Sequence, residues 1–140
     1  MSAFALDSRL AADTIALGDL PLCRLLLMDD ARFPWLILVP RRPDLADLTD
    51  LEPADRTILM EEVAAASRAL AERPGVDKIN VGALGNIVRQ LHVHIVARAI
   101  GDAAWPGPVW GFGERKPYEA VAAQAISRDF ARRLLDNSTD

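Results

Sequence analysis

The only two histidines of the chain, His92 and His94, are separated by a single residue. Apolar residues alternate with polar ones through the segment 90–96, which is the two-residue period of a β-strand. This alternation predicts that Gln90, His92 and His94 share one strand face, with neighbours about 6.5 Å apart. Because an imidazole near neutral pH can act as a base, an acid, a nucleophile or a metal ligand, this face is a candidate site for catalysis.

Two other interpretations of the histidine pair need no catalysis. The side chains can simply lie on a solvated strand face, where polar residues are usually found. They can also supply two ligands to a zinc ion, but such a site needs at least one more ligand. Cys23 or a carboxylate would have to serve, and no acidic residue follows His94 until Asp102.

Apolar runs and helical spacing predict the elements that must position these side chains. Strands grouped together, with helices between and after them, indicate an α+β domain with a mainly antiparallel sheet. The first predicted elements, in chain order, are a short helix after Asp7 or Ser8 that includes Leu10, Ala11 and Ile15, and strands over 20–28 and 35–39. A helix from Pro53 that ends at Pro74-Gly75 comes next, followed by strands over 78–81 and 89–97. The chain then forms an ordered loop over 101–117 and a closing helix that includes Tyr118, Ala122, Ile126 and Phe130.

Length and composition favour one domain over residues 1–140, because 51% of the residues are hydrophobic and 26% are charged. The net charge of −4 argues against a protein that binds a nucleic acid polymer, since such domains usually carry a basic face. The single cysteine, Cys23, fits a reducing compartment. We see neither a signal peptide nor an apolar run long enough to span a membrane, and therefore expect a cytoplasmic protein.

The segment 85–98 resembles the histidine-triad (HIT) family. The family motif is His-φ-His-φ-His-φ-φ, where φ is apolar, preceded by a Gly-polar-x-Val-x segment. Gly85, Asn86 and Val88 match the segment that precedes the motif, and residues 95–98 match its end. The triad strand is specific, because its register is set from both sides.

In this alignment His92 is the middle histidine and His94 is the third, while Gln90 stands where the first should be. The resemblance extends over about residues 22–98. The segments 25–29 and 36–42 look like the family's first hairpin and its Pro-basic exit, and 80–82 looks like its Asn-x-Gly turn. It implies a HIT-like α+β fold with about five mainly antiparallel strands and two main helices. It also implies a homodimer and no cofactor.

The resemblance implies an activity on small-molecule nucleotides. His92 would attack the α-phosphate and form a covalent nucleotidyl-imidazole, which water then hydrolyses. His94 would hydrogen-bond a phosphate oxygen or the leaving group. Gln90 can donate and accept hydrogen bonds but cannot carry a proton charge, so it either leaves turnover unaffected or marks a different leaving group. A non-catalytic nucleotide-binding module is the alternative, and the leaving group stays open among phosphoramidates, adenylates and dinucleoside polyphosphates.

Substrate contacts are also implied by the resemblance. Asp29 stands where the family places an acidic or amide residue against the ribose hydroxyls, and its alternative role is in a turn. Asn80 is expected either to contact the nucleotide or to cap its turn. The positions expected to bind substrate are Asp29, Asn80, Gly85, Asn86 and Val88, and backbone N–H groups of the turn 82–86 can hold phosphate without a lysine. Trp105 and Trp110 either close a wall around the ligand or pack against the sheet or a second subunit.

Overall fold

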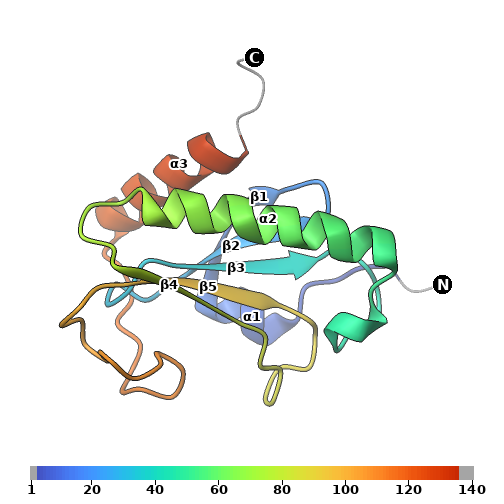
Figure 1. Ribbon diagram of the computed structural model, residues 1–140, viewed down its shortest axis with the longest axis horizontal. Coiled ribbons are helices and arrows are strands. Elements are labelled where there is room, and N and C mark those ends of the chain that lie inside the picture. Colours follow the sequence, from blue (N-terminus) through green and yellow to red (C-terminus); the bar gives the residue numbers. More distant parts are fainter. Residues whose placement is uncertain (1–2, 136–140) are drawn as a thin grey trace.

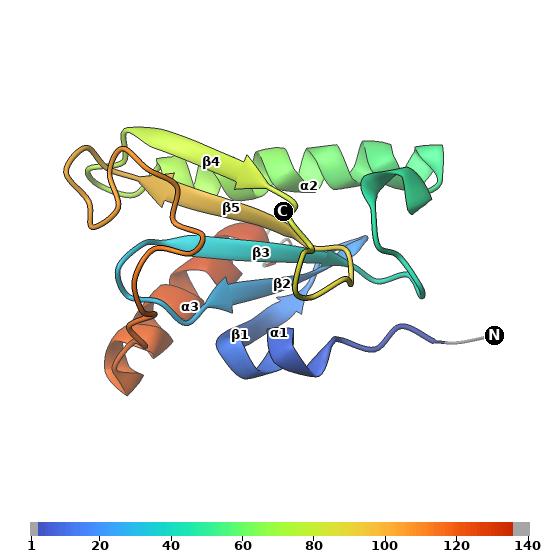
Figure 2. The same cartoon turned by 90° about the horizontal axis from the view of Figure 1, so that it is seen from below.

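The computed structural model describes residues 3–135 and has the predicted α+β architecture. All neighbouring strands pair antiparallel in one sheet of order β1-β2-β3-β5-β4 (Figures 1 and 2). The prediction of about five strands with two main helices is therefore confirmed. The elements are α1 (Ser8–Asp13), β1 (Thr14–Asp19), β2 (Cys23–Met28), β3 (Trp35–Pro40), the 3₁₀ turn η1 (Leu48–Asp50), α2 (Pro53–Ala71), β4 (Lys78–Gly82), β5 (Val93–Arg98) and α3 (Ala120–Leu134).

Each face of the sheet is covered by different elements. Figure 1 shows α2 and α3 on one face, with α1 and the long connection from β5 to α3 on the other. The alternation of side chains along the strands sorts the core accordingly. On β5, Ile95 packs under the two long helices, while Val96 faces the opposite side. Because both faces are covered, β3 is buried at every position and reads as a continuous apolar run.

The N-terminal helix is shorter than predicted, and the strand after it was missed. Ile15 was expected in the helix, but α1 ends at Asp13 and Ile15 lies in β1. That prediction was wrong because Ile15 belongs to a short edge strand, in which only Ile15 and Leu17 alternate as apolar residues before the register becomes irregular between Ala16 and Gly18. The start of α1 follows its local chemistry, since the Asp7 side chain accepts a hydrogen bond from the Arg9 N–H.

The strand that carries the histidines is also shorter than predicted. We expected a strand over 89–97, but β5 begins at Val93, so that His92 lies immediately before it. The β3–β5 ladder pairs Leu38 with Val93, and its continuation would place Pro40 opposite Leu91. Proline has no N–H to donate, which ends the ladder there. The Leu91 N–H instead donates to the Leu45 carbonyl, outside the sheet.

The helices of the described residues, 3–135, include none that is both long and apolar enough to cross a membrane.

Candidate active site

The structure brings His92 and His94 together on the wall of one cleft. Their ring centroids lie 4.8 Å apart, with the ring planes inclined by 68°. The side chains are only 6% and 8% exposed, yet both line the cleft of about 440 Å³. A cleft of this volume is large enough to hold a small-molecule ligand. Its lining residues are Met28, Trp35, Leu84, Gly85, Asn86, Ile87, Val88, His92, His94, Trp110 and Gly111.

The protonation of His92 follows from its hydrogen bond to the main chain. Its Nδ1 lies 2.6 Å from the carbonyl oxygen of Gln90. A carbonyl oxygen can only accept, so Nδ1 must carry the hydrogen and donate it. In the neutral ring the lone pair is then on Nε2. His92 therefore has the tautomer in which Nε2 is available as a nucleophile or a base.

His94 has the opposite tautomer. The indole N–H of Trp35 donates to His94 Nδ1 over 3.0 Å, within the protein interior. An indole N–H is a donor only, so Nδ1 must accept, and the neutral ring carries its hydrogen on Nε2. Burial, with a smaller contribution from neighbouring His92, lowers the pKa of His94 to about 3. His94 is therefore neutral at physiological pH and offers an N–H donor.

Trp110 completes an aromatic cluster around the histidines, whereas Trp105 does not. The Trp110 ring meets both His94 and Trp35 edge to face, at 5.5 and 6.4 Å between centroids. Gly82 makes room for it, because a Cβ at this position would lie 3.1 Å from the indole. Trp105 instead lies against buried Arg98, whose guanidinium carbon is 5.6 Å from the centroid of the Trp105 ring. Of the two tryptophans singled out in the sequence, only Trp110 lines the cleft.

The turn before the histidines contributes three of the predicted binding residues. Gly85, Asn86 and Val88 all line the cleft. Gly85 has a φ of +72°, a backbone conformation that glycine adopts without strain. Val88 packs against the buried cluster beneath the cleft. The local sequence thus supplies both the sharp turn and an apolar anchor for the loop.

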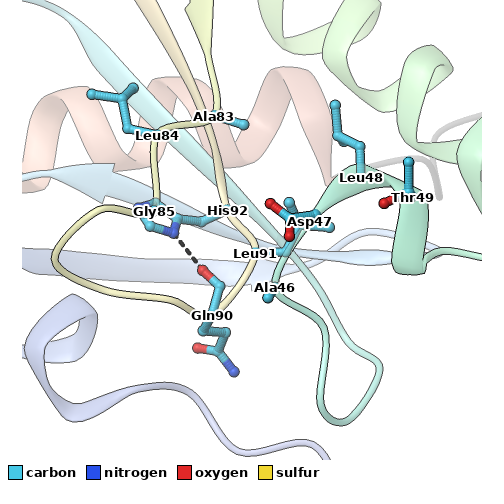
Figure 3. Close-up of a pocket in the computed structure, with 10 residues that line it drawn as sticks. All are labelled: Ala46, Asp47, Leu48, Thr49, Ala83, Leu84, Gly85, Gln90, Leu91 and His92. Carbon is cyan, nitrogen blue, oxygen red and sulfur yellow. Dashed lines mark hydrogen bonds between the residues drawn. The ribbon is translucent and has the colours of Figure 1, made fainter.

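Gln90 does not share the cleft with the histidines, and the predicted three-residue platform is wrong in this respect. Its side-chain oxygen accepts from the Asp7 N–H and its side-chain nitrogen donates to the Ala5 carbonyl, both over 2.8 Å. The side chain therefore holds the N-terminal segment, and only its main-chain carbonyl contacts His92. Figure 3 shows this division, with the amide directed away from the imidazole.

A second, smaller cavity of about 150 Å³ adjoins the same turn, and His92 lines both cavities. Gln90, Asp47 and Thr49 are among its polar lining residues (Figure 3). Asp47 precedes the 3₁₀ turn η1 and Thr49 lies within it, and the turn is held by the Asp50 carboxylate, which accepts from the Asp47 N–H.

Asp29 and Asn80 lie outside the cleft lining. The Asp29 carboxylate accepts from the Tyr118 N–H over 2.9 Å and lies 3.6 Å from the Arg115 guanidinium. The Asn80 side-chain oxygen accepts from Arg98 over 2.9 Å. In this structure both side chains are therefore engaged in tertiary contacts, and their predicted nucleotide contacts remain predictions.

Five cleft residues were not singled out as site residues by the sequence analysis, namely Met28, Trp35, Leu84, Ile87 and Gly111. Trp35 was assigned only to an apolar strand, although the indole N–H of a buried tryptophan usually has a hydrogen-bond partner. Ile87 directly follows the predicted turn 82–86, and its side chain is 81% exposed. Single exposed apolar side chains are common on protein surfaces, so the cleft lining alone assigns Ile87 to the site.

The zinc interpretation lacks further ligands in this structure. Within residues 3–135, no group of three or more His, Cys, Asp or Glu side chains is arranged to hold a metal ion. Cys23 belongs to the buried cluster on the helix-covered face of the sheet, whereas His94 faces the other side. Burial also raises the pKa of the Cys23 thiol, which disfavours the thiolate that a metal needs.

Comparisons with known proteins agree with the fold described above. The model of the HIT domain matches residues 9–100. A histidine triad protein from Bradyrhizobium japonicum is 49% identical with a TM-score of 0.92, over 95% of this chain and 99% of its own. One from Sinorhizobium meliloti is 47% identical with a TM-score of 0.90, over 94% and 97%.

A third solved structure, a histidine triad protein from Marinobacter aquaeolei, is 43% identical with a TM-score of 0.92, over 95% of this chain and 97% of its own. The search of curated proteins found no significant match. The family match covers more than half of the chain and includes the turn, His92 and His94. With its five-stranded sheet and paired imidazoles, this chain belongs to the HIT domain family.

Proposed function

We propose that this protein is a nucleotide hydrolase or nucleotidyl transferase that acts through His92. The Nε2 atom of His92 attacks the α-phosphorus of the nucleotide, forming an N–P bond as the bond from phosphorus to the leaving group breaks. The leaving group departs with that electron pair. Water or another acceptor then attacks phosphorus, the N–P bond breaks, and the electron pair returns to Nε2. Covalent catalysis of this kind divides one difficult step into two easier ones.

The observation that carries this proposal is the pair of opposed tautomers on one cleft wall. His92 donates from Nδ1 to the Gln90 carbonyl, which leaves Nε2 with a lone pair. His94 accepts at Nδ1 from Trp35, which leaves Nε2 with a hydrogen. A nucleophile and a neutral donor, 4.8 Å apart between ring centroids, match the needs of attack on a phosphoryl group.

His94 acts in this proposal as a hydrogen-bond donor to a phosphoryl oxygen. Its pKa of about 3 keeps the ring neutral, so it does not deliver a proton as an imidazolium at neutral pH. The leaving group must then be stable as an anion or take its proton from solvent. Asn86 and the backbone N–H groups of its turn are the further proposed phosphate donors, since the cleft lining within residues 3–135 includes no Lys or Arg.

We further propose that Gln90 occupies the first position of the triad without acting on the substrate. Its amide is engaged with the backbone at Ala5 and Asp7, and its contribution to His92 comes from its main-chain carbonyl. Any residue has such a carbonyl, which explains how glutamine can stand in this position while the nucleophile keeps its support.

The experiment is rapid quenching of the protein with adenosine phosphoramidate, an aminoacyl adenylate or a dinucleoside polyphosphate, each labelled at the α-phosphate. We expect acid-labile label on the wild type and none on His92→Ala, with turnover reduced by about 10³-fold or more. Asp47→Ala is a matched control, because Asp47 lines only the smaller cavity. Binding of nucleoside monophosphate without label or turnover from any of the three substrates would establish the non-catalytic binding module instead.

We also propose that the protein forms a homodimer, as the family resemblance implies. Light scattering across a range of protein concentrations tests this directly. A mass of one chain at every concentration would contradict it.

A further inference from the structure

Trp35 is the first residue of β3, and its side chain reaches His94 on the neighbouring strand β5. The ladder pairs Trp35 with Val96 and Ile37 with His94, so the two rings are diagonal neighbours on the same face of the sheet. The indole nitrogen lies 3.0 Å from His94 Nδ1, and the two ring centroids are 5.6 Å apart. Trp35 is 5% exposed, so water has little access to replace this bond.

The bond constrains His94 in a way that the other aromatic neighbour cannot. Trp110 contacts the same imidazole at 5.5 Å, but its own indole nitrogen is buried without a hydrogen-bond partner. The ring of His92 faces His94 edge on, and its Nδ1 is already engaged with the Gln90 carbonyl. Among the described residues, Trp35 is therefore the group whose hydrogen bond determines which nitrogen of His94 carries the hydrogen.

We propose that Trp35 is a positioning residue that locks His94 in the tautomer with hydrogen on Nε2. The indole can only donate, so the opposite tautomer would place two N–H groups against each other in a buried site. The opposite tautomer would leave a buried donor unpaired, and the free-energy cost of that makes the locked tautomer dominant. Protonation of His94 is opposed in the same way, because an imidazolium has no acceptor to offer the indole.

The role of this lock in turnover rests on the proposed function. With the lock in place, His94 Nε2–H is available to a phosphoryl oxygen without any rearrangement at the moment of reaction. Without it, part of the population would hold the hydrogen on Nδ1 and present a lone pair to the negative phosphate. Repulsion would then replace a hydrogen bond in the transition state.

The lock itself is tested without any substrate, by nitrogen-15 NMR of the imidazoles. The full chain has only two histidines, so a two-bond proton–nitrogen correlation spectrum is simple to assign. At about pH 7 we expect His94 to show an unprotonated Nδ1 and a protonated Nε2, and His92 to show the reverse. A protonated Nδ1 on His94 in the wild type would overturn the proposal.

Trp35→Phe removes the donor and keeps an aromatic ring. We expect His94 in this variant to exchange between tautomers, with averaged nitrogen shifts. Trp110→Phe is the matched control, because it also removes an indole N–H beside His94 but one that donates to nothing. We expect its tautomer spectrum to be that of the wild type. Equal changes in both variants would overturn the proposal.

Trp35 is a core residue, so each variant is first checked for folding by its backbone amide spectrum. Should Trp35→Phe fail to fold, replacement of Trp35 alone by benzothienylalanine, in which sulfur takes the place of the N–H in a ring of nearly the same shape, supplies the same test. Retention of a pure Nε2–H tautomer in a folded variant without the indole donor would refute the lock.

In turnover, we expect Trp35→Phe to lower kcat by roughly 10-fold, below the 10²–10⁴-fold of a positioned proton-transfer group, with KM nearly unchanged. Trp105→Phe serves as the activity control, since Trp105 lies against Arg98 outside the cleft. A locked tautomer in an inactive wild type would refute the proposed function alone. A loss of the lock with unchanged kcat would refute the catalytic role of Trp35 alone.

Discussion

At the scale of single residues, the two imidazoles differ through what their Nδ1 atoms contact. His92 Nδ1 meets a carbonyl oxygen that can only accept, and His94 Nδ1 meets an indole N–H that can only donate. The same kind of side chain thus offers a lone pair at Nε2 of His92 and an N–H at Nε2 of His94, with the two ring centroids 4.8 Å apart. Each tautomer of the neutral ring is imposed by its neighbour.

His94 should make the stability of the fold depend on pH. Its folded pKa of about 3 lies below the ordinary value of 6.5, so the unfolded chain binds more protons in this window. The stabilisation is complete above about pH 6.5 and falls by about 1.4 kcal/mol per unit as the pH decreases toward 3. Urea unfolding of the wild type and of His94→Gln between pH 4.5 and 7 measures the difference. Identical slopes for both proteins would contradict the prediction.

Gln90 should matter for the N-terminal segment more than for turnover. Gln90→Met keeps the length of the side chain but removes its bonds to Ala5 and Asp7. We expect faster proteolysis before α1 and a loss of about 1–2 kcal/mol of stability, with kcat within about threefold of the wild type. Gln124→Met, the same change at an exposed position of α3, is the control. A kcat loss as large as that of His92→Ala would show that the amide acts on the substrate.

At the scale of elements, the strands are held in place by a few buried polar contacts with the helices and loops. The carboxylate of Glu62, in the middle of α2, accepts from the N–H groups of Leu22 and Cys23 at the start of β2. These bonds satisfy the main chain where β2 enters the core. The contact ties the long helix to the sheet whose other face carries His94.

Removal of this contact should destabilise the whole domain. Glu62→Ala leaves the Leu22 and Cys23 N–H groups buried and unpaired, which should cost about 3 kcal/mol of unfolding free energy. Glu61→Ala is the matched control, because Glu61 is exposed on the same helix and should change stability by less than about 0.5 kcal/mol. Chemical denaturation measures both. Equal losses for the two variants would show that helix propensity, not the buried carboxylate, is responsible.

At the scale of the whole molecule, the long connection from β5 to α3 both closes the cleft and returns the chain to the sheet. It begins at Arg98, which is buried and bonded to Asp102 through two guanidinium nitrogens. It carries Trp110 over Gly82 and then reaches the β2–β3 turn, where the Tyr118 N–H donates to Asp29. The face opposite the long helices, seen in Figure 2, is thus covered by a segment without regular secondary structure.

Two substitutions of Asp29 distinguish its tertiary contact from its predicted ribose contact. Asp29→Asn keeps an acceptor for the Tyr118 N–H, and Asp29→Ala removes it. If Asp29 serves only to hold the Tyr118 N–H, Asp29→Ala should lose about 1 kcal/mol of stability and Asp29→Asn should lose less. The KM for the nucleotide should then change little in either variant. Thermal unfolding and steady-state kinetics together decide this. A raised KM in Asp29→Ala at unchanged stability would support the ribose contact instead.

The sequence by itself determined the class of fold and the location of the chemistry. Buried strands leave continuous apolar runs, and α2 leaves a four-three-four stripe from Leu59 to Leu70, so these elements follow from local patterns. The histidine pair with its Gly85 turn is likewise a short-range signal, and the family match includes it. Edge strand β1 left no such signal, because its pairing with β2 has an irregular register.

Only the tertiary structure decided what each polar side chain of the site contacts. The pattern around Gln90 predicts a face shared with the histidines, but the ladder ends near Pro40 and the amide turns to a segment 85 residues earlier in sequence. Trp35 and His94 are 59 residues apart, so the bond that sets a tautomer is invisible to any local pattern. Local propensities act over a few residues, whereas hydrogen-bond partners in a buried site are chosen by the packing of the whole chain.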